Sequence, residues 1–185
     1  MKRTAIREKG FFLILLIFFA GWRAWGCSES LPLSPRQAGF RDQVFRVLER
    51  LADPLAQPVA QEDKRGIQGV LLRLFSVCAD DCEGLLDNVV VLDRDGVTIA
   101  VYPEEKVPMW NFSDYAAVKR AVESKTPVPA ILYRPDGTAI SAICAPLLHK
   151  ERVEGVVVLV IESRKLKEKL GLTETEFLSL DFSRS

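Results

Sequence analysis

The chain has 185 residues, of which 48% are hydrophobic and 27% are charged, so it is long enough for one globular domain with its own core. The first 26 residues hold five basic residues and one acidic residue, and the remaining 20 basic and 24 acidic residues give a net charge of −4. Without a basic stripe in that remainder, we expect no binding to nucleic acid.

Residues 1–26 have the pattern of an export signal peptide. Basic residues precede an apolar run, and small residues follow at Ala24 and Gly26, as at a cleavage site. The run has about 12 residues, whereas a membrane-spanning helix needs about 20. Cleavage after Gly26 would leave Cys27 first, which resembles the lipidation site of a bacterial lipoprotein. We expect an exported, periplasmic or extracytoplasmic protein tethered to the membrane through Cys27; plain secretion and an uncleaved anchor are the alternatives.

Two helices are predicted after a polar tether at 27–34. Apolar residues at helical spacing indicate a first helix over 35–53. Pro54 and Pro58 predict that this helix ends there, because proline disrupts a helix interior. The next apolar stripe predicts a second helix over 63–77, whose first residue, an aspartate, is a suitable N-cap.

Five short runs rich in β-branched residues predict an antiparallel sheet. Turns ending in Gly96 and Gly137 join the first two runs and the next two, because glycine supplies the positive φ that such turns need. Between these hairpins a short helix is expected over 115–123, capped by Ser113 or Asp114. The fifth run is almost wholly apolar, which predicts a central strand covered on both faces. The predicted strands are 88–92, 97–101, 128–133, 138–145 and 155–161.

Three cysteines follow the tether. Cys78 and Cys82 lie four residues apart near the predicted end of the second helix. Export to an oxidising compartment permits a disulfide between them, and two free thiols fit the sequence equally. Cys144 lies in an apolar strand and is predicted to be a small core residue.

The sequence has none of the common catalytic or cofactor patterns. It has one histidine, no glycine-rich phosphate loop, no nucleophile elbow and no ligand spacing typical of zinc, iron or calcium sites. We therefore expect no catalytic residue, no metal and no cofactor.

Three segments resemble the Cache family of extracellular sensor domains, which are related to the PAS fold. They are VLDRDG at 91–96, WNFSD at 110–114, and ICAPL at 143–147 followed by the fifth strand. Their order and spacing carry the resemblance, since each segment alone occurs in many sheets.

The resemblance covers residues 35–161 and implies an α+β, PAS-like single domain. Its five-stranded antiparallel sheet would lie over 88–161. The N-terminal helices, over 35–77, would pack on one face, and a loop and short helix would cover the other. Residues 162–185 would form a charged C-terminal tail with a helical start.

In similar domains a pocket for small carboxylates, amino acids or amines lies under the loop and short helix. The resemblance implies a ligand-binding pocket walled by Trp110, Phe112, Tyr115, Tyr133, Ser141 and Ile143, for each of which core filling is the alternative role. Many relatives have an arginine that binds a carboxylate where this chain has Tyr115. This departure indicates a neutral ligand or a degenerate pocket.

Three functions follow from these observations. The first is a stand-alone, membrane-tethered sensor domain that binds a small organic molecule and signals through a membrane receptor or kinase. The second is a structural or interaction lipoprotein with a degenerate pocket. The third is a thiol-redox protein that uses Cys78 and Cys82, although these lack the two-residue spacing of thiol oxidoreductases.

Overall fold

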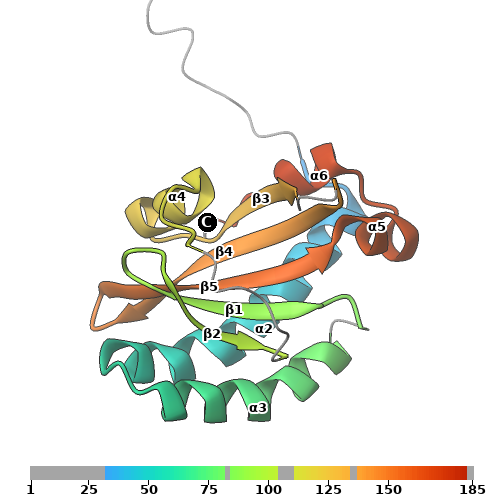
Figure 1. The fold of residues 1–185 in the computed structure, drawn as a ribbon. Coiled ribbons are helices and arrows are strands. Elements are labelled where there is room, and N and C mark those ends of the chain that lie inside the picture. The colour runs from blue at the N-terminus through green and yellow to red at the C-terminus, as the bar shows by residue number, and fades with distance from the viewer. Residues whose placement is uncertain (1–31, 82–83, 104–110, 134–136, 183–185) are drawn as a thin grey trace, which may run out of the picture. The chain divides into compact units, whose positions relative to one another are not determined.

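The computed structural model describes residues 32–81, 84–103, 111–133 and 137–182, with the backbone alone for 74–81. Figure 1 labels the elements, which are α2 (Pro35–Ala60), α3 (Lys64–Asp81), β1 (Asn88–Asp93), β2 (Thr98–Tyr102), α4 (Ala116–Ser124), β3 (Val128–Tyr133), β4 (Ala139–His149), β5 (Arg152–Glu162), α5 (Ser163–Lys165), the π-helix η1 (Leu166–Leu170) and α6 (Glu174–Leu178). Among the described residues, no helix is long and apolar enough to cross a membrane.

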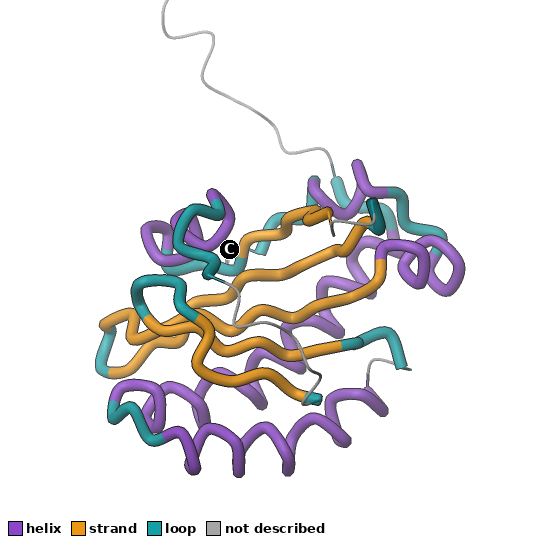
Figure 2. Tube along the Cα trace, in the orientation of Figure 1, coloured by secondary structure: helices purple, strands orange, loops and turns teal. Residues whose placement is uncertain are grey.

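The strands form one antiparallel sheet in the order β2-β1-β5-β4-β3 (Figure 2). The predicted five-stranded α+β fold is confirmed, and β5 is the central strand, as expected. Its side chains are buried on both faces, because Val157 and Leu159 belong to one apolar cluster and Val156 and Val158 belong to another. The sheet therefore separates two cores.

The larger core lies between the sheet and α2, and we call this side the α2 face. A buried stripe on α2 runs from Phe40 to Val59 at helical spacing. It packs against alternate residues of the strands, among them Val91, Ile143 and Leu159. In Figure 1, α2 and α3 both lie on this side of the sheet.

The first helix is longer than the prolines predict. Helix α2 passes through Pro54 and Pro58 and ends at Ala60. A proline inside a helix costs about 3 kcal/mol, because it removes a backbone hydrogen bond and crowds the preceding turn. Leu55 and Val59 continue the buried stripe through this segment, and their burial offsets that cost.

Two local predictions about caps and turns are confirmed. Asp63 caps α3, since its Oδ1 accepts a hydrogen bond from the Gly66 amide over 3.0 Å. In the β1–β2 turn, Asp93 Oδ1 accepts hydrogen bonds from the amides of Asp95 and Val97, each over 2.9 Å. Gly96 has φ +81°, as the turn requires.

The segment after β5 is part of the α2-face core. Phe177 and Phe182 are fully buried, and their rings contact Phe40 and Phe45 of α2 at centroid distances of 6.2 and 5.6 Å. Gln37 of α2 donates hydrogen bonds to the Glu176 carbonyl and the Ser179 hydroxyl. The segment predicted as a charged tail thus closes the core beside α2.

Candidate functional site

The second core lies on the opposite side of the sheet, which we call the loop-helix face. Its buried residues come from four strands, from α4 and from the segment before α4. They are Val90, Leu92, Ala130, Ala142, Cys144, Val156 and Val158 of the strands, with Phe112, Ala117, Val118 and Ala121. This is the face on which the sequence predicts a ligand pocket.

The segment before α4 is hydrogen-bonded to the β1–β2 turn. The Phe112 amide donates a hydrogen bond to the Gly96 carbonyl over 2.8 Å, and Val97 forms a β-bridge with Asn111. A Cβ atom at Gly96 would lie 2.8 Å from the Ser113 Cα atom, so only glycine permits this approach. The turn thereby fixes where Phe112 enters the core.

Helix α4 begins one residue later than predicted and has a different cap. Tyr115 occupies the N-cap position and makes no side-chain capping bond. The predicted caps are wrong because the Tyr115 amide bonds the Phe112 carbonyl over 3.0 Å, forming a turn that places Ser113 and Asp114 before the cap. The Tyr115 ring contacts the Phe112 ring at 5.2 Å and is 41% exposed.

Asn88 is the polar exception on this face. It lies two residues before Val90 along β1 and therefore on the same face, pairs with Val160 of β5, and is only 7% exposed. Its Nδ2 atom has no hydrogen-bond partner among the described residues. Val160 is half-buried, as is Val101, which pairs with Val90, so the face is less tightly covered at this end than under α4.

The face directly beneath α4 is closely packed. Ala121 of α4 and Ala142 of β4 have no exposed surface, and Cys144 is 3% exposed. Small side chains at these positions let the helix lie close to the strands. Toward Asn88, the covering side chains of Val101 and Val160 are only half-buried.

The core role predicted for Cys144 is confirmed, and its chemistry is suppressed. Burial raises the pKa of the thiol to about 12, against a smaller opposing effect of Arg120. The thiol stays protonated at neutral pH and is a poor nucleophile. In the described ranges, no cluster of histidine, cysteine, aspartate or glutamate could hold a metal ion.

The sheet separates the predicted pocket residues. Phe112 and Tyr115 lie at the loop-helix face, whereas Ser141 and Ile143 point to the α2 face, because they alternate with Ala142 and Cys144 along β4. Tyr133 pairs with Ala139 on the same side as Ser141 and is 67% exposed. One pocket cannot use all five side chains.

Several predicted positions lie outside the described residues. They are the signal peptide at 1–26, Cys27, Cys82, Trp110 and the side chain of Cys78. Asn88 was not predicted as a site residue. The available signal was a lone amide at the start of an otherwise apolar strand.

No protein-family model and no curated protein matches the sequence. Three similar solved structures are bacterial sensor domains. The ligand-binding domain of the Pseudomonas aeruginosa PAO1 amino-acid chemoreceptor PctC, in complex with GABA, has a TM-score of 0.53 and 18% identity, covering 72% of this chain and 59% of that one. The corresponding domain of the Pseudomonas fluorescens chemoreceptor CtaA, in complex with L-serine, has a TM-score of 0.56 and 17% identity, covering 75% and 60%. The sensor domain of the Vibrio cholerae histidine kinase DctB has a TM-score of 0.52 and 13% identity, covering 85% and 60%.

The chain has a Cache-type fold. It spans 59 to 60% of the length of these three solved structures. At 13 to 18% identity the likeness concerns the Cache-type fold alone, and function has to be argued from this chain's own residues.

Proposed function

We propose that this chain is an exported, membrane-tethered Cache-type sensor domain that binds a small organic ligand on its loop-helix face and signals through a partner protein. Three observations support the proposal. The fold is shared with ligand-binding domains of chemoreceptors and with a histidine-kinase sensor domain. Residues 1–26 have the pattern of an export signal, and Asn88 places in an apolar face an amide nitrogen that has no hydrogen-bond partner among the described residues.

The main observation behind the proposed site is the buried Asn88 amide nitrogen, which has no hydrogen-bond partner among the described residues. A buried donor without a partner costs about 1–3 kcal/mol relative to a satisfied one, so an apolar residue would serve the core better. The half-buried Val101 and Val160 beside it offer apolar contact to a small molecule. Such a site suits a ligand with an apolar body and a carbonyl or hydroxyl oxygen that accepts the Nδ2 hydrogen bond.

No charged side chain is buried on this face among the described residues, which favours a neutral ligand. Lys119 and Arg120 of α4 are exposed, and Lys119 lies 3.8 Å from the Asp114 carboxylate. Tyr115 occupies the position at which many Cache domains have an arginine that binds a carboxylate. Its ring lies against Phe112 and its side chain is partly exposed, so it can close over a ligand with an apolar surface.

Asn88→Leu tests the site, because leucine has a similar volume and no polar atom. A thermal-shift screen of small neutral metabolites on the wild type identifies stabilising compounds. The variant should melt at a higher temperature without ligand and lose the shift that those compounds produce. The absence of any stabilising compound, or a shift that persists in the variant, would refute the proposed site.

Two tyrosines provide a matched comparison. Tyr115→Ala removes the ring that is proposed to close over the ligand, and Tyr133→Ala removes a ring on the opposite side of the sheet. The proposal expects the first change alone to alter the ligand-induced shift. Equal effects of the two changes would argue for a nonspecific response.

A second candidate function is an interaction domain whose pocket is degenerate. The close packing of Ala121, Ala142 and Cys144 favours it. It predicts that no compound stabilises the chain and that a membrane receptor or kinase co-purifies with wild type and with Asn88→Leu alike. Loss of that partner in the variant would favour ligand sensing instead.

The membrane tether is tested separately at Cys27. With lipidation, the wild type fractionates with membranes and Cys27→Ser becomes soluble after export. An uncleaved anchor would keep both in the membrane, and plain secretion would leave both soluble. An alanine substitution at Cys144 is the control for the loss of a thiol, because alanine buries no polar group there.

A further inference from the structure

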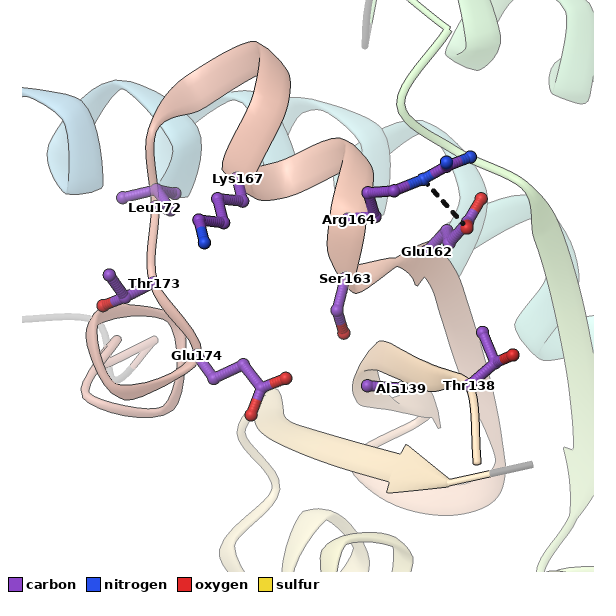
Figure 3. Close-up of a pocket in the computed structure, with 9 residues that line it drawn as sticks. All are labelled: Thr138, Ala139, Glu162, Ser163, Arg164, Lys167, Leu172, Thr173 and Glu174. Carbon is purple, nitrogen blue, oxygen red and sulfur yellow. Dashed lines mark ion pairs between the residues drawn. The ribbon is translucent and has the colours of Figure 1, made fainter. Parts of the chain in front are cut away.

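A cavity of about 640 Å³ lies at the end of the sheet, away from the loop-helix face. Its walls are the start of β4, the end of β5, and the segment that runs from α5 to the first residue of α6 (Figure 3). Ala139 and Leu172 supply apolar surface, and Leu172 is buried in the α2-face core. None of the residues that line the cavity belongs to the second core on the loop-helix face.

Three polar side chains reach the same open space in Figure 3: Ser163, Lys167 and Glu174. No ion pair or hydrogen bond of the Lys167 ammonium or the Glu174 carboxylate is found among the described residues. By contrast, Arg164 at the rim already pairs with Glu162 over 3.5 Å. Among the described residues, one cation and one anion without partners therefore line opposite parts of a single cavity.

The Ser163 hydroxyl adds a hydrogen-bond donor. Its oxygen lies 2.8 Å from the oxygen of Ser141, which is 1% exposed and has no other side-chain partner among the described residues. Either hydroxyl can donate in this pair, and we assign the donor role to Ser141, because its buried hydrogen needs an acceptor and Ser163 is its one side-chain partner among the described residues. The Ser163 hydrogen is then left to donate into the cavity.

The backbone that carries Lys167 is held in place. The π-helix η1 begins at Leu166, which is buried, and ends at Leu170, and its C-cap Gly171 has a φ of +63°. A Cβ atom at Gly171 would lie 2.8 Å from an Arg36 guanidinium nitrogen of α2. Short π-helices occur frequently at functional sites. In this one, Lys167 directly follows the buried Leu166.

We propose that this cavity binds a small zwitterion, a molecule with one carboxylate and one ammonium group. The Lys167 ammonium and the Ser163 hydroxyl bind the carboxylate, and the Glu174 carboxylate binds the ammonium. A simple anion would face the uncompensated charge of Glu174, and a simple cation would face that of Lys167. The proposal is independent of the ligand site on the loop-helix face.

Isothermal titration of the full-length chain tests this with four probes of increasing charge separation: glycine, β-alanine, γ-aminobutyrate and 5-aminovalerate. One length should bind best, and acetate and ethylamine, with a single charge each, should bind far more weakly. Lys167→Ala and Glu174→Gln should each lower the affinity at least about tenfold, because each removes a charge-assisted hydrogen bond. Lys150→Ala and Glu151→Gln, in the exposed β4–β5 turn, are the matched controls and should change nothing.

The outcomes separate this cavity from the site at Asn88. Binding that is lost in Lys167→Ala and Glu174→Gln but kept in Asn88→Leu supports the cavity. Binding that survives both changes overturns it, and if Asn88→Leu then abolishes binding, the molecule occupies the loop-helix face. No binding by any of the four probes at millimolar concentration, or equal binding of acetate, also overturns the proposal.

Discussion

The Asp87 carboxylate accepts a hydrogen bond from the Glu162 amide over 2.6 Å, which joins the residue before β1 to the last residue of β5. The same carboxylate pairs with the Lys165 ammonium of α5. Asp87 thus fixes where the chain leaves the sheet and enters the segment that carries Ser163 and Lys167.

Asp87→Ala should therefore lower the free energy of unfolding by about 1–3 kcal/mol, because it leaves a partly buried amide and ammonium without their acceptor. Urea denaturation followed by circular dichroism measures the change. Asp95→Ala, at an exposed position in the β1–β2 turn, should stay within about 0.5 kcal/mol of the wild type. Equal effects of the two substitutions would show that Asp87 does not join β1 to β5.

Gly96 and Gly137 form a matched pair with φ of +81° and +82°. A Cβ atom at Gly96 would lie 2.8 Å from the Ser113 backbone, whereas a Cβ atom at Gly137 would have no atom of the described residues within 4 Å. Gly137→Ala should cost about 1–2 kcal/mol for the left-handed backbone alone. Gly96→Ala should cost about 1–3 kcal/mol more, because the Phe112 segment has to move. Urea unfolding of both variants measures the difference, and equal costs would contradict the close approach.

Phe177→Ala should destabilise the chain by about 3–5 kcal/mol, because it empties a fully buried position against Phe40. The neighbouring Leu178 is 49% exposed, and Leu178→Ala should cost less than about 1 kcal/mol. Thermal and urea unfolding measure both changes. A small effect of Phe177→Ala would mean that the segment after β5 is not part of the cooperative core.

Glu176 gives a prediction about pH. Its pKa lies below the ordinary value of 4.5, chiefly because its carboxylate accepts a hydrogen bond from the Thr173 amide, and also because it accepts one from the Thr173 hydroxyl. The lowered folded-state pKa means that Glu176 contributes stability above pH 4.5 and that this contribution is lost as the pH falls below 4.5.

Glu176→Gln should therefore be less stable than wild type near neutral pH and should lose less of its stability on acidification. Unfolding free energies at about pH 7 and about pH 3 measure this. Glu151→Gln, in an exposed turn, is the control. A parallel loss of stability in wild type and Glu176→Gln would rule out the capping interaction as a source of acid sensitivity.

Cys144, with a pKa of about 12, should resist thiol reagents at pH near 8 until the chain unfolds, because the thiolate is the reacting form. Mass spectrometry of labelled peptides measures the labelling of Cys144 separately from that of Cys78 and Cys82. Labelling of Cys144 in the native chain as fast as in the denatured chain would contradict its burial. The same experiment tests the thiol-redox alternative, which requires Cys78 and Cys82 to exchange between thiol and disulfide.

The strands and the first hairpin were predictable because their signals are local. Asp93 and Gly96 determine the β1–β2 turn within four residues, and the apolar run of β5 requires cover on both faces. The length of α2 and the burial of Phe177 were not predictable, because both depend on contacts between segments far apart in the chain. Proline propensity alone favoured an earlier helix end.

The pocket residues show a different limit. Along β4, the odd-numbered and the even-numbered residues are both mainly apolar. The sequence therefore does not reveal which of the two sets faces α2 and which faces α4. Ser141 and Ile143 were expected in one pocket with Phe112, but they lie on the opposite side of the sheet from it. Asn88 was visible as a lone polar residue, but its missing partner is a property of the folded chain alone.

The contact between Phe40 and Phe177 joins residues near opposite ends of the described chain. During synthesis the apolar stripe of α2 emerges first, and its partner emerges only after all five strands. Non-local closure of this kind slows folding and leaves apolar surface bare in the meantime. A chain truncated after β5 should therefore remain protease-sensitive and bind chaperones, and protection should require residues 177–182.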